Sequence, residues 1–403
     1  MARNRTFLLI LSLILSAGCI SGVYLHHPVS KQIPQVSVWL PFWDWDRTLA
    51  SFRQNKDLID EAIPYWYDIT TTGALIPAQG IPEMIAAGKL NLDYAAFVTE
   101  AHRYKIKVIP LISNEFNGKL VHQILPDAPA RAQLMKNIVT LVNENHYDGV
   151  DLDFEGMLAA DRELYPQFLK ELGTELHRYH KKLSVCVHAK TKEPGGWDAV
   201  IAQDYQAIGL YADSVRIMGY DYHYAGGDPG AIAPLDWVEK VVQFAVTKIP
   251  PNKISLGVPI YGINWYDRNT ANWNPLLVAP LPVIKDEEGM FLDAVSLAKQ
   301  YHVPIHFDEP GQSHWFTYTD TSTGIKRTVW FESHLGFRSR WDLAKHYRVQ
   351  SISLWRIGGE DPKLWQYIRS DKSKLFYPSD PNNPKKSNPQ VGIDIIFGID
   401  HRW

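Results

Sequence analysis

Eight short runs of apolar and β-branched residues recur between residues 36 and 355, and segments with helical periodicity separate them. Several of these runs are apolar throughout, which is typical of parallel strands that are covered on both faces. Between them, Leu134, Ile138, Leu141 and Val142 follow the spacing of a buried helix face. This alternation predicts an α/β protein with a (β/α)8 TIM barrel. The strand candidates are residues 36–40, 62–67, 107–112, 149–154, 183–188, 214–220, 253–260 and 350–355.

The interval between the seventh and eighth candidates is far longer than the others. It holds two alternating runs, residues 314–319 and 326–331, around a Thr323-Gly324 turn, which predicts a β-hairpin. We therefore expect a small α+β insertion between strands 7 and 8, at about residues 264–331. Such an insertion would form one wall above the barrel mouth.

The first residues have the composition of an export signal. Arg3 and Arg5 precede an apolar run at 7–15, which is too short to span a bilayer. Small residues at 16–18 then lead to Cys19, in a pattern that resembles a bacterial lipobox. Residues 1–19 are thus predicted to be a lipoprotein signal with lipidation at Cys19, which would anchor the protein to a membrane of the cell envelope. Ordinary cleavage, giving a secreted or periplasmic protein, is the alternative.

Residues 20–34 are interpreted as a short tether, and residues 35–371 as the barrel with its insertion. A Pro/Asn-rich tail, 372–403, contains an alternating apolar stretch at 391–400. This stretch could be an added edge strand or a partner-binding tail, and the pattern does not separate the two.

The stretch from Asp148 to Glu155 carries the chemistry. Side chains alternate between the two faces of a strand, so Asp151, Asp153 and Glu155 share one face. Neighbouring carboxylates about 6.6 Å apart repel by roughly 2.5 kcal/mol at an effective dielectric of about 20, or nearly two pKa units. At least one of the three should therefore hold or share a proton, as a general acid must.

Two other interpretations of this stretch fit it less well. If the stretch were an exposed acidic edge strand, the apolar character of its opposite face, formed by Val150, Leu152 and Phe154, would be unexplained. A calcium-binding EF-hand loop would begin at Asp151, but its twelfth position is Arg162 rather than Glu, and the flanks do not look like paired helices. Catalysis is favoured, and no metal or other cofactor is expected.

Polar and aromatic side chains collect at the carboxyl ends of the predicted strands, where barrel enzymes place their active sites. This is the composition of a sugar-binding cleft, in which flat rings stack on the CH faces of the sugar. The substrate-binding candidates are Asp221, Trp355, Tyr222, Trp43, Tyr67, Asn114 and Tyr261.

The net charge of −3 gives no electrostatic reason to expect a nucleic-acid partner. With Cys19 lipidated or removed, Cys186 is the remaining cysteine, so no intrachain disulfide is expected. Cys186 lies in an apolar run and is predicted to be a small core residue. We expect a monomer that is stabilised by its core alone.

Three motifs carry a family resemblance. They are Asp148-x-x-Asp151-x-Asp153-x-Glu155, Met218-x-Tyr220-Asp221 and Trp355. With them, the chain resembles the family-18 glycoside hydrolases over about residues 35–370. The amino-acid sequence around the second, sixth and seventh strands is most similar to that of the bacterial branch that contains spore-cortex-lytic N-acetylglucosaminidases. The Ser-x-Gly-Gly found on the third strand of chitinases is absent.

This resemblance implies a retaining hydrolase of β-linked N-acetylglucosamine polysaccharide, most plausibly peptidoglycan, with chitin-type oligomers as a further possibility. Glu155 would be the general acid and base, and the N-acetyl group of the substrate would be the nucleophile. Asp153 would orient that group, Asp151 would share a proton with Asp153, and Tyr220 would hydrogen-bond the acetamido group.

In the same implied scheme Asp221 would contact the sugar and Trp355 would form the floor of the −1 subsite. A non-catalytic sugar-binding protein, a transglycosylase and an N-glycan endoglycosidase are the alternatives. Exo and endo action are not distinguished by the sequence.

Overall fold

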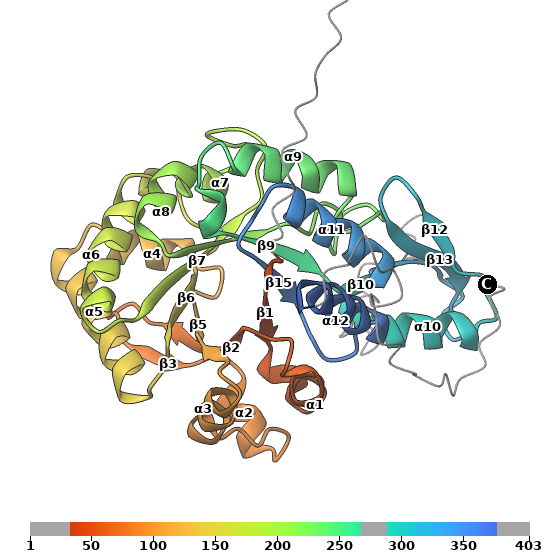
Figure 1. Ribbon diagram of the computed structural model, residues 1–403, viewed down its shortest axis with the longest axis horizontal. Coiled ribbons are helices and arrows are strands. Elements are labelled where there is room, and N and C mark those ends of the chain that lie inside the picture. The colour runs from red at the N-terminus through yellow and green to blue at the C-terminus, as the bar shows by residue number, and fades with distance from the viewer. Residues whose placement is uncertain (1–32, 267–287, 377–403) are drawn as a thin grey trace, which may run out of the picture. The chain divides into compact units, whose positions relative to one another are not determined.

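A computed structural model describes residues 33–266 and 288–376 of the chain (Figure 1). The predicted signal, its lipidation at Cys19 and most of the tether lie outside these residues, as does nearly all of the tail from residue 377 onward.

Eight parallel strands close into a barrel (Figure 1). Each strand pairs in parallel with the next, and β1 pairs with both β15 and β2, so the sheet has no free edge. The predicted (β/α)8 barrel is therefore confirmed. In barrel order the strands are β1 (Gln35–Leu40), β2 (Glu61–Ile69), β5 (Leu111–Ser113), β6 (Gly149–Asp153), β7 (Lys182–His188), β8 (Ser214–Met218), β9 (Ile254–Pro259) and β15 (Ser351–Trp355).

The third strand differs from its prediction, which placed one strand over residues 107–112. It is split into β4 (Lys107–Val108) and β5, both of which pair with β2. Pro110 stands between the two pieces, and a proline has no N–H with which to continue the ladder. A short strand, β3 (Leu75–Pro77), pairs antiparallel with the last residues of β2.

Helices surround the barrel, and each packs one of its faces against the barrel (Figure 1). In α6, for example, Phe168, Leu172 and Leu176 recur at helical spacing and are fully buried. The helices are α1 (Trp45–Asn55), α2 (Ile81–Ala86), α3 (Tyr94–Arg103), α4 (Gly118–Ile124), α5 (Ala128–Glu144), α6 (Leu164–Arg178), α7 (Asp198–Ala202), α8 (Tyr205–Tyr211), α9 (Leu235–Ala245), α11 (His334–His346) and α12 (Pro362–Phe376).

Between β9 and α11 the chain forms a second, antiparallel sheet with the order β11-β10-β14-β13-β12, and α10 (Phe291–Gln300) packs beside it. The predicted hairpin is present, because β13 (Ser313–Thr319) pairs with β14 (Lys326–Phe331). The sheet begins at β10 (Tyr261–Tyr266), three residues before the expected Asn264, since the chain enters it almost directly from β9. The other two strands are β11 (Glu288–Met290) and β12 (His306–Asp308).

Three aspartates at the amino-terminal end of the barrel make the same pair of contacts. Asp60, Asp148 and Asp213 each precede a strand and accept the backbone N–H of a neighbouring strand at 2.8 Å. Each also bonds a basic side chain from a surrounding helix, namely Lys372, His102 and His177 in turn. The recurring contact joins strand to strand and helix to barrel at the end opposite the predicted site.

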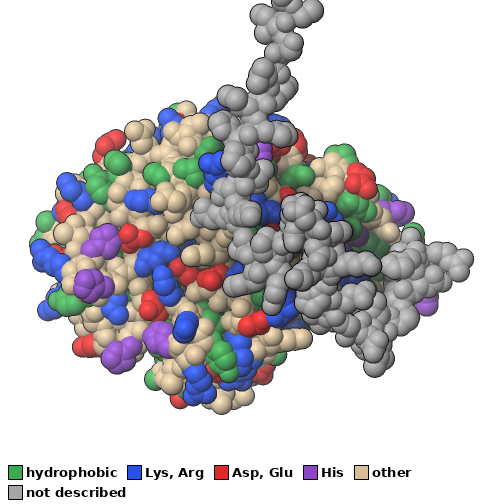
Figure 2. All heavy atoms as spheres, viewed as in Figure 1, with side chains coloured by type: hydrophobic (Ala, Val, Ile, Leu, Met, Phe, Trp, Pro, Cys, Tyr) green, Lys and Arg blue, Asp and Glu red, His purple; other side chains and the backbone are tan. Residues whose placement is uncertain are grey.

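On the face of the molecule shown in Figure 2, acidic and basic side chains are interspersed over the described surface. No helix within residues 33–266 or 288–376 is both long and apolar enough to cross a membrane.

Candidate active site

The acidic strand β6 presents its two faces to different surroundings. Val150, Leu152 and Phe154 are buried in the main core, where the ring of Phe154 stacks on that of Phe168 in α6 at 6.4 Å. The alternate side chains, Asp151, Asp153 and Glu155, lie on the inner face of the strand. Period-two geometry thus separates the packing residues from the acidic ones.

Burial and mutual repulsion change the protonation of two of these acids. Burial, with the charge of Asp151 next, raises the pKa of Asp153 to about 7. Burial, followed by the charges of Asp153 and Asp221, raises the pKa of Glu155 well above its ordinary value. Near neutral pH the site therefore holds protons that exposed carboxyl groups would have lost.

Asn114 holds the backbone of Glu155 from the neighbouring strand. Its side-chain amide donates to the Glu155 carbonyl and accepts from the Glu155 N–H, both at 2.8 Å. Asn114 itself is buried. Both polar ends of this predicted substrate-binding residue are thus engaged by Glu155, so its contacts indicate a positioning role.

His188 lies beside Glu155 at the end of β7, with 3.6 Å between its Nε2 atom and a Glu155 carboxyl oxygen. Burial, together with the charge of Lys190, lowers the pKa of His188 to about 4, so the imidazole is neutral at neutral pH. Trp197, which is 52% exposed, packs on this ring at 4.6 Å. Sequence reasoning missed His188, although a histidine at the carboxyl end of a predicted barrel strand was a usable signal.

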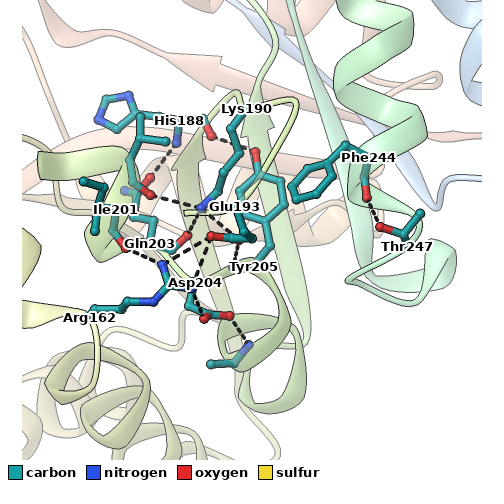
Figure 3. Close-up of polar contacts among 12 residues, drawn as sticks. Arg162, His188, Lys190, Glu193, Ile201, Gln203, Asp204, Tyr205, Phe244 and Thr247 are labelled. Carbon is teal, nitrogen blue, oxygen red and sulfur yellow. Dashed lines mark hydrogen bonds and ion pairs between the residues drawn. The ribbon is translucent and has the colours of Figure 1, made fainter. Parts of the chain in front are cut away.

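A buried polar cluster behind the strand ends supports both residues (Figure 3). The Gln203 side chain accepts the His188 N–H at 2.7 Å and donates to the Phe154 carbonyl at 3.2 Å, which ties β7 to the end of β6. The Lys190 ammonium donates to the carbonyls of Val200 and Gln203. The loop between β7 and α8 is thereby fixed against the site.

Arg162, the twelfth position of the calcium loop considered above, belongs to the same cluster. Its guanidinium pairs with Glu193 and Asp204 and donates to the Ile201 carbonyl (Figure 3). Among residues 33–266 and 288–376, no group of three or more His, Cys, Asp or Glu side chains is arranged to hold a metal ion.

Aromatic rings line the site opposite the acids. The rings of Tyr220 and Trp355 are nearly parallel, with centroids 6.5 Å apart, and Trp43 lies 6.3 Å from Trp355. Trp43 is 40% exposed, so part of its side chain is open to solvent. The structure therefore brings these three predicted residues together.

Two further candidates meet through a hydrogen bond. The Tyr261 hydroxyl donates to the Asp221 carboxylate, and the Tyr261 ring is buried edge-on to that of Tyr220. Burial raises the pKa of Asp221, while the bond from Tyr261 opposes that rise. Tyr222 points outward, with 51% of its surface exposed, and packs on Trp237 of α9.

Tyr67 does not lie with the other candidates. Its ring stacks on Tyr94 of α3, and its hydroxyl bonds that of Tyr147 at 2.7 Å, inside the layer between barrel and helices. The register of β2 against β5 shifts between Tyr65 and Tyr67, and this irregularity turns Tyr67 away from the mouth. Tyr65 is the residue of β2 that lies near Trp43, at 5.8 Å. The prediction that Tyr67 binds substrate is corrected accordingly.

Asp151 lies deeper than the other acids and has partners that the sequence did not suggest. Arg216 of β8 donates to its carboxylate at 3.0 Å, and the Cys186 thiol of β7 donates to the other oxygen at 3.2 Å. Cys186 is buried and unpaired, in line with its predicted place in the core.

Known proteins share this sequence and architecture. YdhD of Bacillus subtilis, a glycosylase described as sporulation-specific, is 33% identical over 318 residues, which are 77% of this chain and 70% of YdhD. The cortical fragment-lytic enzyme of the same organism is 30% identical over 311 residues, 76% of this chain and 68% of that enzyme. The crystal structure of the Bacillus cereus spore cortex-lytic enzyme SleL superposes with a TM-score of 0.71 at 25% identity, covering 84% of this chain and 75% of SleL.

The sequence profile of glycosyl hydrolases family 18 matches residues 68–360, a span that holds the acidic strand, Tyr220 and Trp355. The chain belongs to glycosyl hydrolases family 18.

Proposed function

We propose that this glycosidase hydrolyses β-linked N-acetylglucosamine in a polysaccharide, with peptidoglycan as the first candidate and chitin-type oligomers as the second. The names of the relatives support this choice, since two of them are cortex-lytic or cortical fragment-lytic enzymes. The observation that carries the proposal is Glu155, a largely buried carboxyl group at the end of β6 whose pKa is raised well above its ordinary value, on the barrel rim that also bears the Tyr220–Trp355 pair.

The proposed reaction is substrate-assisted and retains the anomeric configuration. Glu155 donates its proton to the glycosidic oxygen as the bond from that oxygen to C1 breaks, and the carbonyl oxygen of the substrate's own N-acetyl group bonds C1. Water then opens the resulting oxazolinium at C1 and returns a proton to Glu155.

The neighbouring residues have supporting roles in this scheme. Asp153 accepts the acetamido N–H and stabilises the positive charge that develops on that group. Tyr220 hydrogen-bonds the acetamido oxygen, Asp221 contacts the sugar, and Trp355 forms the floor beneath the reacting ring.

In this proposal the enzyme lies in the cell envelope, anchored through a lipid on Cys19, and the predicted export signal supports that location. Globomycin, which blocks lipoprotein signal cleavage, should cause the unprocessed precursor to accumulate. Normal processing in its presence would instead support a secreted or periplasmic form.

The decisive test replaces Glu155 by Gln, which keeps the size of the side chain and removes its transferable proton. We expect the rate of hydrolysis to fall by about 100- to 10,000-fold, the usual contribution of a general acid, with substrate binding retained. Purified peptidoglycan, chitin oligomers and N-glycans would be digested side by side and the products identified by mass. Undiminished turnover by Glu155→Gln would end the proposal.

The same digestion separates the alternatives. Longer glycans among the products would indicate transglycosylation, and release of whole N-glycans would indicate an endoglycosidase. Failure of the wild-type enzyme to release reducing ends from all three substrates would contradict the proposed substrate class.

A further inference from the structure

The pair formed by Asp151 and Arg216 is sealed inside the barrel. Both residues have no exposed surface, and the Arg216 Nε atom donates to one carboxylate oxygen of Asp151 at 3.0 Å. The thiol of Cys186 donates to the second oxygen at 3.2 Å. Each oxygen of Asp151 therefore accepts a hydrogen bond, one from β8 and one from β7, and these bonds suit an ionised carboxylate.

The two remaining nitrogens of the Arg216 guanidinium also donate hydrogen bonds. They donate to the Glu61 carboxylate of β2 at 2.8 Å and to the Ser353 hydroxyl of β15 at 2.9 Å. Lys182 of β7 donates to the other oxygen of Glu61 at 2.6 Å. Two acids and two bases thus alternate across the barrel, and when all four are ionised their charges sum to zero.

The charges of this cluster act strongly on Glu61. Burial alone would raise the pKa of Glu61, yet the charges of Arg216 and Lys182 lower it to about 2. An arginine does not lose its proton in proteins, so Arg216 remains a cation throughout. Neutralising Asp151 would leave that buried cation with one partner fewer, and a buried charge that has lost a partner is strongly unfavourable.

Asp153, the next acid on the same face, is in the opposite situation. No residue among those described hydrogen-bonds its buried Oδ1 atom. The group that faces it along the strand is the carboxylate of Asp151, and Glu155 and the phenol of Tyr220 lie on its outer side. The phenol of Tyr165, from α6, is a further titratable group beside both aspartates.

We propose that Arg216 is a positioning residue that holds Asp151 as a permanent anion, so that the exchangeable protons of the acidic trio reside on Asp153 and Glu155. Asp151 then acts as a fixed negative charge behind Asp153, and it does not share a proton with Asp153 as the family resemblance implies. The consequence for catalysis rests on the proposed function, whereas the distribution of protons can be measured without any substrate.

The test is a carboxyl titration of the full chain by ¹³C NMR with labelled aspartate. The signals of Asp151 and Asp153 are assigned from their absence in Asp151→Asn and Asp153→Asn. Between about pH 5 and 9, a window above the ordinary range of aspartate, the Asp153 signal should titrate near neutral pH. The Asp151 signal should stay at the ionised position. If both signals titrate together with one midpoint, the two residues share the proton and the proposal is overturned.

Variants of the two cations extend the test. Arg216→Gln removes the cation from Asp151, so the Asp151 signal should now titrate within this window and the alkaline limb of the pH–activity profile should move to higher pH. Arg216→Lys should restore the wild-type pattern, because the charge is kept. Lys182→Gln is the matched control, since it removes a cation that contacts Glu61 but not Asp151.

An Asp151 signal that does not titrate in folded Arg216→Gln would overturn the assignment of Arg216. Circular dichroism identifies any variant that does not fold, and in that case the wild-type titration alone decides. An enzyme that shows this titration but cleaves no N-acetylated glycan would contradict the proposed function and leave the proton distribution intact.

Discussion

Asp153, which the proposed reaction places beside the substrate's acetamido group, lies in an unfavourable environment for a carboxylate. In the unfolded chain its carboxyl group has an ordinary pKa near 3.8, and in the folded protein burial and the charge of Asp151 raise the pKa to about 7. A raised pKa means that the folded state binds the proton more tightly. The associated stability is complete below about pH 4 and is lost as the pH rises through 7.

Replacing Asp153 by Asn should therefore stabilise the protein at alkaline pH while reducing its activity. The difference between the two pKa values sets an upper limit of about 4 kcal/mol on the gain in free energy of unfolding at pH 8. Denaturant unfolding at pH 4 and pH 8 measures it, and the gain should be much smaller at pH 4. An equal effect at both pH values would mean that ionisation of Asp153 is not the cause.

The same environment predicts the alkaline limb of activity. In the proposed reaction Glu155 must be protonated to donate to the glycosidic oxygen, and its pKa is raised by burial and by the charges of Asp153 and Asp221. Neutral His188, 3.6 Å away, adds no cation that would oppose this rise near pH 7. The protonated acid thus persists into the neutral range, as general-acid catalysis requires.

At the scale of the elements, the ends of β6 and β7 are joined through a single side chain. Gln203 spans the His188 N–H and the Phe154 carbonyl, and its own backbone carbonyl receives Lys190. The acid Glu155 follows Phe154 directly, so the position of Glu155 depends on this bridge. A small displacement of a catalytic group has a large effect on rate.

Gln203→Ala should lower both stability and kcat. Two backbone groups lose their partners, at a cost of about 1–3 kcal/mol each when buried, and kcat should fall by about tenfold or more. Gln167→Ala is the control, because Gln167 makes one hydrogen bond on the exposed face of α6 and should change stability by less than about 0.5 kcal/mol. Full activity in a destabilised Gln203→Ala would refute the link to Glu155.

The acidic motif itself divides between structure and chemistry. Asp148, its first residue, lies at the base of β6, where it accepts from the Val108 N–H and bonds His102. Asp213 makes the same pair of contacts at the base of β8, with Leu183 and His177. Membership of the motif therefore does not imply a place at the mouth.

Asp148→Ala should destabilise the fold by about 1–2 kcal/mol and leave the activity of the folded fraction unchanged. Asp213→Ala, which lies outside the motif, should do the same. Thermal unfolding and specific activity, measured together on both variants, check this expectation. A large loss of kcat in Asp148→Ala alone would mean that this residue also serves the reaction.

Across the whole molecule, the first and last parts of the barrel are joined by contacts between residues more than 300 positions apart. Lys372 of α12 donates to the Leu58 carbonyl at 2.9 Å and to the Asp60 carboxylate at 3.1 Å. The same Asp60 carboxylate accepts the Val36 N–H of β1. Arg369 pairs with Asp57 nearby. These contacts reinforce the seam at which β15, the last strand of the barrel, pairs with β1.

Lys372→Met should lower the free energy of unfolding by about 1–2 kcal/mol. The substitution removes a partly buried charged donor, so the Leu58 carbonyl and the Asp60 carboxylate both lose a hydrogen bond. Lys240→Met removes a cation whose partner, Asp236, is exposed, so its effect on the free energy of unfolding should be clearly smaller. Denaturant midpoints compare the two variants. Equal losses would show that the seam contact is no stronger than an ordinary surface pair.

Much of this architecture could be predicted from local patterns. Period two in β6 assigns Asp151, Asp153 and Glu155 to one face, and the alternation of strands with helices indicates the barrel and its active rim. The hairpin at residues 313–331 follows from its two alternating runs and their turn. These features depend on neighbours within a few residues, so sequence spacing alone determines them.

The partners of those residues depended on the tertiary structure. Arg216 contacts Asp151, and Asn114 holds the backbone of Glu155, because the barrel sheet brings together residues that are 65 and 41 positions apart in the chain. Tyr67 turns into the helix layer because a local shift in register overrides the alternation. Spacing along the chain decides which acids face inward, but electrostatics between distant strands decides which of them keeps a proton.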